Sequence, residues 1–332
     1  MNNNKLEILG KEKLNKNFFK KGKVDFKYSR LFNMSEENVI NYMTYIASSN
    51  GYKKPYEVDI KKEFLYIKGE IPIMLAAHID TVVLGTPVLQ HDKTRNILWS
   101  SKNGLGADDR AGVSAIIEII TSGLKPHILL CDGEELGCVG ARSVVKNIGA
   151  PEVKYIIDLD RRGDNDAVFY DCDNPEFEQY IENFGFKSSY GTFTDISVLS
   201  PYWGIAGVNL SIGYYDAHTK DEYLKINEWQ KTVDKLKIML KNPPSEQFKY
   251  IEKKYPLYTY KTSFKDYYDV YDYEEDDYYS SIKVTSEDLA SYLGGNKQDW
   301  ELWLLDNKEF VEEIIFTVIE DYICGHPPKN ME

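Results

Sequence analysis

The chain has 332 residues, enough to bury a sizeable core, and its hydrophobic content of 42% is ordinary for a globular protein. It carries 40 Lys and Arg residues against 53 Asp and Glu residues, and this net charge of −13 argues against a broad nucleic-acid-binding surface. No apolar run approaches the roughly 20 residues of a membrane-spanning helix, and the lysine-rich N-terminus contains no apolar signal core. The four scattered cysteines are typical of reduced thiols, so we expect a cytoplasmic protein that contacts neither membrane nor nucleic acid.

The predicted elements begin after a basic N-terminal arm. Residues 1–34 show little apolar periodicity, so we expect them to be loosely held. Ser35 is followed by two glutamates, which predicts a helix start with acidic side chains at the positive end of the helix dipole. The Asn-Gly pair at 50–51 ends this helix, and residues 56–60 and 64–68 alternate like strands.

Strands and helices alternate in the next part of the chain. Apolar runs at 73–77 and 127–131 are bounded by polar residues, which predicts buried central strands. Between them, short predicted strands at 88–91 and 97–99 flank a turn, and residues 110–120 have the apolar spacing of a helix. This alternation predicts a three-layer α/β/α fold around a mixed, mostly parallel central sheet.

The second half of the chain falls into two parts. Helices are predicted at 175–184 and 226–240, with a strand near 207–211. Residues 243–281 are dominated by tyrosine and acid, which predicts a solvated acidic linker; a docking site for a protein partner is the alternative. Apolar residues at helical spacing predict a small helical C-terminal module at 282–332.

Potential metal ligands directly follow the predicted strands. His78 and Asp80 come after the run at 73–77 and share a face if this segment is extended. Neutral imidazoles and carboxylates are the ligands of metal sites that split amides. Asp80 could itself bind a metal, or it could accept the second ring N–H of His78 and fix the tautomer of that imidazole.

A Gly-rich turn presents two adjacent aspartates before the helix at 110–120. The two oxygens of Asp108 could each reach one of two cations roughly 3.5–4 Å apart. Asp109 is better suited to capping the helix N-terminus.

Further acids and one more histidine are candidates for the same metal site. Glu134 and Glu135 point different ways in a loop, so one can bind metal while the other accepts a proton from the bound water. Asp158 and Asp160 are two residues apart after another short strand, and a late loop supplies His218.

Three phrases carry a family resemblance. H-x-D-T at 78–81, G-A-D-D-R-A-G at 106–112 and D-G-E-E-L-G at 132–137 resemble, in this order, the co-catalytic di-zinc exopeptidases of clan MH. That clan includes aminopeptidases, tripeptidases, carboxypeptidases and related deacylases. Because the spacing leaves no room for an inserted domain, the resemblance is to the compact single-domain aminopeptidase-like branch and covers residues 35–242.

The resemblance implies two divalent metal ions. Zn²⁺ is the expected metal, and Co²⁺ or Mn²⁺ are the alternatives. It implies Glu134 as the general base and Asp80 as the partner of His78, and it implies a cis peptide bond after Asp108. The phrase I-I-D-L-D-R-R-G favours Asp160 over Asp158 as the acid of the first metal. The residues implied as metal ligands are His78, Asp108 and Asp160 on one ion, and Asp108, Glu135 and His218 on the other.

The implied activity is hydrolysis of short peptides from the N-terminal end by a metal-activated water. A deacylase acting on N-acyl amino acids and a non-catalytic binding protein on the same fold are the alternatives. The segment at 191–196 resembles a family loop that borders the pocket, so Thr194 and Asp195 are candidate substrate contacts. Arg161 could grip a substrate carboxylate bidentately, with an ordinary surface arginine as the alternative.

Overall fold

The computed structural model describes residues 16, 19–53, 57–58 and 63–253. These residues belong to the first of two compact units, Met1–Pro256, and the second unit is Leu257–Glu332. The predicted helical module at 282–332 and most of the predicted linker lie outside the described residues. None of the helices in the described ranges combines the length and apolar content that a membrane span requires.

A central mixed sheet organises the fold, as predicted. Its four middle strands are parallel neighbours, and antiparallel strands flank them. Parallel strands bring their carboxyl ends to one edge of a sheet, which is where open α/β proteins carry their sites. In the described part of the chain the order across the sheet is β1 (Glu57–Val58), β2 (Phe64–Ile67), β6 (Pro126–Cys131), β3 (Ile71–His78), β7 (Ile156–Arg161), β10 (Gly207–Ser211), β8 (Asp166–Val168) and β9 (Lys187–Ser189).

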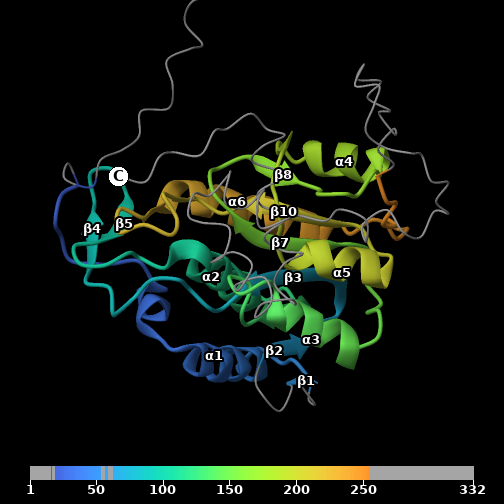
Figure 1. Ribbon diagram of the computed structural model, residues 1–332, viewed down its shortest axis with the longest axis horizontal. Coiled ribbons are helices and arrows are strands. Elements are labelled where there is room, and N and C mark those ends of the chain that lie inside the picture. The colour runs from blue at the N-terminus through green and yellow to red at the C-terminus, as the bar shows by residue number, and fades with distance from the viewer. Residues whose placement is uncertain (1–15, 17–18, 54–56, 59–62, 254–332) are drawn as a thin grey trace, which may run out of the picture. The chain divides into compact units, whose positions relative to one another are not determined.

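Helices cover both faces of this sheet because successive strand residues point to opposite faces. In β3, Leu75 and Ala77 belong to one core cluster, whereas Met74 and Ala76 belong to the other. Figure 1 shows α2 and α6 on one side of the sheet and α3 and α5 on the other. The helices are α1 (Glu36–Ser49), α2 (Ala107–Thr121), α3 (Val139–Asn147), α4 (Pro175–Glu182), α5 (Asp195–Trp203) and α6 (Ile226–Lys241).

Local sequence explains where the first helix begins. The Ser35 side chain accepts a hydrogen bond from the Asn38 N–H at 3.4 Å, and Glu36 and Glu37 occupy the first turn. The predicted helices and central strands are therefore present in the described residues. Two short strands, β8 and β9, were not predicted.

A second, antiparallel sheet lies beside the first, and the sequence analysis predicted only half of it. The predicted strands on either side of the turn at 92–96 are β4 (Leu89–Asp92) and β5 (Ile97–Ser100). They are joined by β12 (Tyr223–Lys225) and β11 (Tyr214–Tyr215), which come from much later in the chain. The loop between β11 and β12 carries His218, so this sheet fixes both ends of that loop.

The N-terminal boundary that we predicted is wrong. Residues 19–34 are not a loosely held arm, because Phe26, Tyr28 and Phe32 are buried in the main core. The Phe26 ring lies edge-on to Trp229 of α6, with ring centroids 5.2 Å apart, and the Tyr28 hydroxyl donates to Glu118 of α2. Edge-to-face aromatic pairs add to the free energy gained by burial. The arm is therefore part of the folded unit from residue 19 onward.

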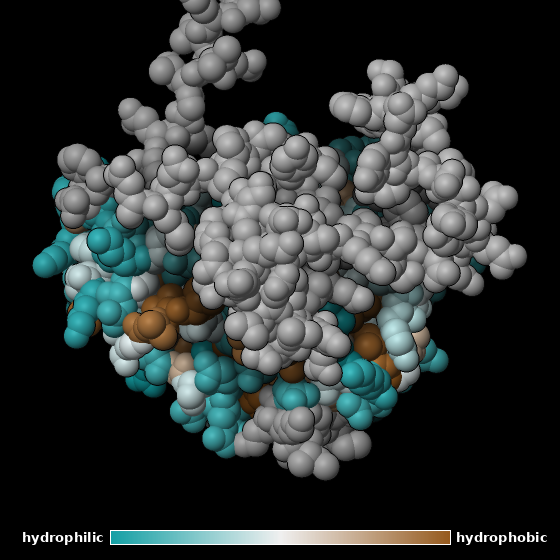
Figure 2. All heavy atoms as spheres, in the orientation of Figure 1, coloured by the Kyte–Doolittle hydropathy of each residue, from teal (hydrophilic) through white to brown (hydrophobic). Residues whose placement is uncertain are grey.

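The predicted end of the unit at residue 242 is also too early. Phe248 packs against Tyr155 and Phe177, with ring centroids 6.1 and 5.1 Å away, and Lys249 forms a β-bridge with Ile205. Residues 243–253 are thus tied to the sheet and to α4 rather than forming the start of a solvated linker. The surface of the described residues is mainly hydrophilic in the view of Figure 2, with small apolar patches.

Truncation of Phe26 tests whether the N-terminal segment is structural. Phe26→Ala should lower the free energy of unfolding by about 3 kcal/mol, because it empties a buried aromatic position. Urea denaturation followed by circular dichroism measures this change. Tyr45→Ala on α1, where the ring is exposed, is the matched control and should have little effect. Equal midpoints for the two variants would contradict the packing described above.

Candidate metal centre

The candidate site lies at the carboxyl ends of three adjacent parallel strands. His78 is the last residue of β3, Asp160 lies near the end of β7, and the loop after β6 carries Glu134 and Glu135. The strand order β6-β3-β7 places these three elements side by side. The register pairs His78 with Cys131, the last residue of β6, so the ligand-bearing segments leave the sheet at the same level.

Asp108 lies between two imidazoles. Its Oδ1 atom is 2.9 Å from Nε2 of His78, and its Oδ2 atom is 3.1 Å from Nε2 of His218. Each oxygen of this one carboxylate therefore faces a different histidine. These residues are 30 and 110 positions from Asp108 in the sequence, so only the tertiary fold brings them together.

Each of the two histidines also has a second acid beside it. Asp160 Oδ1 is 3.6 Å from His78 Nε2, and Glu135 Oε1 is 2.7 Å from His218 Nε2. Potential ligand atoms of His78, Glu134 and Asp160 lie within 4.8 Å of one another, as do those of His78, Asp108 and Glu135. All five residues predicted as ligands are therefore neighbours in space.

Asp80 organises the loop around His78. Its Oδ1 atom is 3.2 Å from His78 Nδ1 and also accepts the Glu134 N–H at 3.1 Å, while its Oδ2 atom accepts the Glu135 N–H at 3.2 Å. A carboxylate at Nδ1 favours the tautomer that carries its proton there, which leaves Nε2 free to bind a metal. Asp80 thus links β3 to the loop that carries both glutamates.

Asp160 is held from three sides, and Asp158 lies deeper. The Thr194 hydroxyl is 2.9 Å from an Asp158 oxygen and 3.0 Å from an Asp160 oxygen. The Tyr214 hydroxyl donates to Asp160 Oδ1 at 3.1 Å, and the Asn209 side chain bonds both the N–H and the C=O of Asp160 at 3.0 Å. Of the two acids, Asp160 is the one that the structure places beside His78.

The side chains around the cluster strongly perturb one another. Burial alone would lower the pKa of His78, but Asp160, Asp108 and Asp80 raise it well above its usual value. Burial and then the Asp108 charge raise the pKa of Asp160 to about 7, and burial and then Asp160 raise the pKa of Glu134 to about 10. Crowded carboxylates of this kind resist ionisation unless positive charge compensates them.

This donor set fits divalent cations. Carboxylate and imidazole ligands suit Zn²⁺, Co²⁺ and Mn²⁺, and mutual repulsion among the acids is the condition that a bound cation relieves. The cis peptide bond expected between Asp108 and Asp109 is present. Asp109 Oδ1 accepts the Gly112 N–H at 2.8 Å, which is the capping role expected of it.

The three predicted substrate contacts are buried or bonded within the protein. Thr194 and Asp195 are almost fully buried, and the Thr194 hydroxyl is used by the two aspartates. Arg161 donates to the Tyr190 carbonyl at 2.8 Å and lies 3.7 Å from Asp166. Their contact with a substrate stays a prediction.

The sequence analysis missed several supporting residues. Tyr214 and Asn209 support Asp160, and Glu222 accepts hydrogen bonds from the segment that leads into Asp108. Tyr214 and Asn209 gave no local signal, because their role depends on β10 and β11 lying beside β7. Glu222 lies four residues after His218, in D-A-H-T-K-D-E at 216–222, so its closeness to a predicted ligand was a signal that could have been used.

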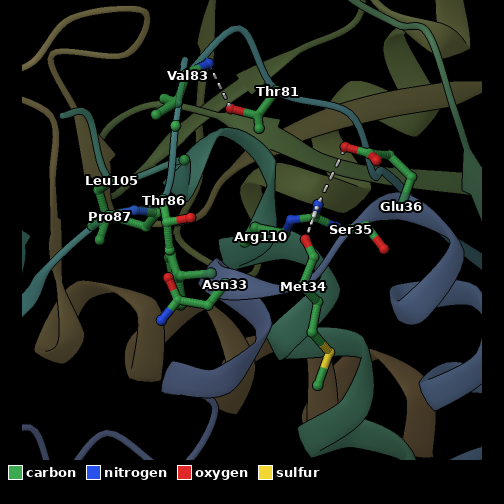
Figure 3. A pocket seen from close by; sticks show the side chains of 13 residues that line it. Asn33, Met34, Ser35, Glu36, Thr81, Val83, Thr86, Pro87, Leu105 and Arg110 are labelled. Atoms are coloured by element: carbon green, nitrogen blue, oxygen red, sulfur yellow. Dashed lines mark hydrogen bonds and ion pairs between the residues drawn. The ribbon is translucent and has the colours of Figure 1, made fainter.

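A cavity of about 220 Å³ lies beside the site, between the start of α1 and the segments at 81–87 and 105–106 (Figure 3). Arg110 of α2 contributes to its wall and donates to the Met34 carbonyl at 3.0 Å, with Glu36 3.8 Å away. None of the predicted metal ligands lines this cavity. Arg110 therefore connects α2 to the N-terminal segment rather than to the metal centre.

An α/β sheet with imidazoles and carboxylates gathered at the carboxyl ends of its parallel strands is the arrangement of a metal-dependent hydrolase. Residues 66–197 match the family described as Peptidase family M28. This match confirms the resemblance to clan MH over the segment that carries most of the site. The matched segment includes His78, Asp108, Glu135 and Asp160, and it ends before His218. A search of curated proteins found no match.

Solved structures show the same fold at low sequence identity. Aminopeptidase PepT from Bacillus cereus aligns with a TM-score of 0.54 and 16% identity, over 64% of this chain and 96% of that chain. A tripeptidase from Staphylococcus aureus aligns with a TM-score of 0.52 and 14% identity, over 65% of this chain and 97% of that chain. These likenesses support the α/β architecture described above.

Removal of the Tyr214 hydroxyl tests how Asp160 is held. Tyr214→Phe should weaken metal affinity and activity about 10-fold, because Asp160 loses a donor that orients it. Competition with a chromogenic chelator measures the affinity. Tyr202→Phe, on the exposed side of α5, makes the same chemical change away from the site and should behave like the parent protein. Identical affinities for all three proteins would show that Tyr214 does not support the site.

Proposed function

We propose that the chain is a two-metal aminopeptidase that hydrolyses short peptides from the N-terminal end. The observation that carries this proposal is the position of Asp108, whose two oxygens each face a different histidine. His78, Asp108 and Asp160 would hold one cation. Asp108, Glu135 and His218 would hold the other. When bound, the two cations would supply a water of lowered pKa and positive charge for the oxyanion that develops during amide hydrolysis.

Glu134 is the proposed general base. Its N–H donates to Asp80, so its backbone is fixed, and its carboxylate lies with His78 and Asp160 at the edge of the cluster. In the reaction this carboxylate would take a proton from the attacking water and give it to the nitrogen of the leaving amine. The neighbouring acids favour the protonated form of Glu134, and positive charge in the site would favour the ionised form that a base requires.

Apolar side chains next to the site residues favour a peptide substrate with an apolar residue. Leu136 follows Glu135, Val82 and Leu84 follow Asp80, and all three are exposed. The names of the two structural neighbours, an aminopeptidase and a tripeptidase, point to short peptides as the substrate class. The free, buried thiols of the described cysteines are consistent with the cytoplasm, which we propose as the compartment.

Substitution of the two adjacent glutamates tests the division of labour between them. Glu134→Gln should lower kcat by about 10²–10⁴-fold while bound metal stays near two ions per chain, because a base is lost but no ligand is. Glu135→Gln is the matched neighbour and should lose metal. Metal analysis beside steady-state kinetics makes the comparison. Loss of metal in Glu134→Gln, with retention in Glu135→Gln, would reverse the two assignments.

A substrate panel tests the reaction class. Metal-loaded protein should hydrolyse leucine p-nitroanilide and leucine-containing tripeptides, and a chelator should abolish this activity. N-acetylated versions of the same compounds should be stable, because an aminopeptidase requires a free amine. Hydrolysis of the acetylated series alone would identify a deacylase. Stability of every compound in the presence of two bound ions would indicate a binding protein.

A further inference from the structure

Glu222 is a buried acid that joins the turn carrying Asp108 to the loop carrying His218. Only 1% of the residue is exposed. Its Oε2 atom accepts the N–H groups of Leu105 and Gly106 at 3.0 and 2.5 Å, and its Oε1 atom accepts the N–H of Asp108 at 2.9 Å. One carboxylate therefore accepts three N–H groups of the turn that carries Asp108.

These three donors lie at the irregular start of α2. The element begins after Gly106, but Asp108 and Asp109 have non-helical backbone angles, and Asp109 caps the regular helix that follows them. The buried N–H groups before Asp109 still need an acceptor, and Gly106 has no side chain to supply one. Glu222, which follows Asp108 by 114 residues, supplies it.

The other end of Glu222 is rigidly connected to His218. The Thr219 hydroxyl donates to the Asp216 carbonyl at 2.7 Å and accepts the Asp221 N–H at 3.1 Å, which closes the turn between His218 and Glu222. The strand β12 begins at the next residue and pairs with β5. The turn therefore cannot shift relative to the second sheet without breaking these bonds.

We propose that Glu222 is a positioning residue that sets the separation between Asp108 and His218, and with it the affinity of the cation site that these two residues share with Glu135. This inference rests on the proposed function. Asp108 belongs to a turn at the start of α2, whereas His218 belongs to a loop of the second sheet. Besides the contact between the two site side chains, the Glu222 carboxylate joins these segments directly, and Lys16 bridges the Asn103 and Lys220 carbonyls beside it.

Glu222→Gln tests this role with little change in shape. One carboxylate oxygen becomes an NH₂ group, which would face an N–H donor and displace the Asp108 turn. We expect the dissociation constant of the second cation to rise about 10- to 100-fold. Titration with Co²⁺, followed by its visible absorption bands, reports affinity and ligand geometry without relying on turnover. Thermal unfolding of the metal-free variant is recorded in parallel.

Glu228→Gln is the matched control, because Glu228 also pairs with neighbours, Tyr215 and Lys225, but contacts no part of the metal centre in the described structure. Its Co²⁺ titration should equal that of the parent protein. A purely structural role for Glu222 would lower the unfolding midpoint of the metal-free variant and leave the cation affinity of the folded protein unchanged. That outcome would overturn the proposal.

Glu222→Asp provides a second test if the glutamine variant does not fold. It keeps the carboxyl group that accepts the N–H groups of the Asp108 turn but shortens the link by one methylene, so the protein should fold and bind the second cation more weakly. Unchanged affinity in Glu222→Asp would also overturn the proposal. Parent protein that binds no cation would contradict the proposed function itself. Parent protein that binds two, together with unaltered variants, would contradict only the role of Glu222.

Discussion

The geometry of the candidate metal centre depends on one carboxylate, that of Asp108, which is held between two imidazoles. Asp108 contacts His78 from the first sheet through one oxygen and His218 from the second sheet through the other. For this geometry to form, the end of β3, the start of α2 and the loop between β11 and β12 must all be fixed relative to one another. The packing of α2 against the sheet and α6, and the hydrogen bonds of Glu222 and Asp80, supply those constraints.

The same arrangement brings several acidic side chains close enough to repel one another. Asp108, Asp160, Glu134 and Glu135 converge in a partly buried space, where burial and the Asp108 charge raise the pKa of Asp160, and burial and Asp160 raise the pKa of Glu134. Hydrogen bonds from Tyr214 and other neutral donors orient these acids but do not neutralise them. The fold thus holds a cluster of acids that divalent cations would stabilise, which is the property a two-metal hydrolase requires.

Segments outside the predicted unit complete the fold through aromatic packing. Phe26 and Tyr28 reach α6 and α2 from the N-terminal side, and Phe248 reaches α4 from the C-terminal side. Neither segment has the regular apolar spacing of an amphipathic helix or strand, so periodicity gave no indication that they are buried. Their burial depends on surfaces that exist only once the sheet and its helices have assembled.

The sequence by itself determined the alternation of strands and helices, the chemical class of the site and the identity of its candidate ligands, because apolar runs and the polar residues after them are local features. Only the tertiary structure decided that Asp160 rather than Asp158 lies beside His78, that Thr194 and Arg161 are used internally, and that Glu222 binds the turn that carries Asp108. Those outcomes depend on which strands become neighbours and on the depth of each side chain, and contacts across 30 to 114 residues are not encoded in any short stretch of the chain.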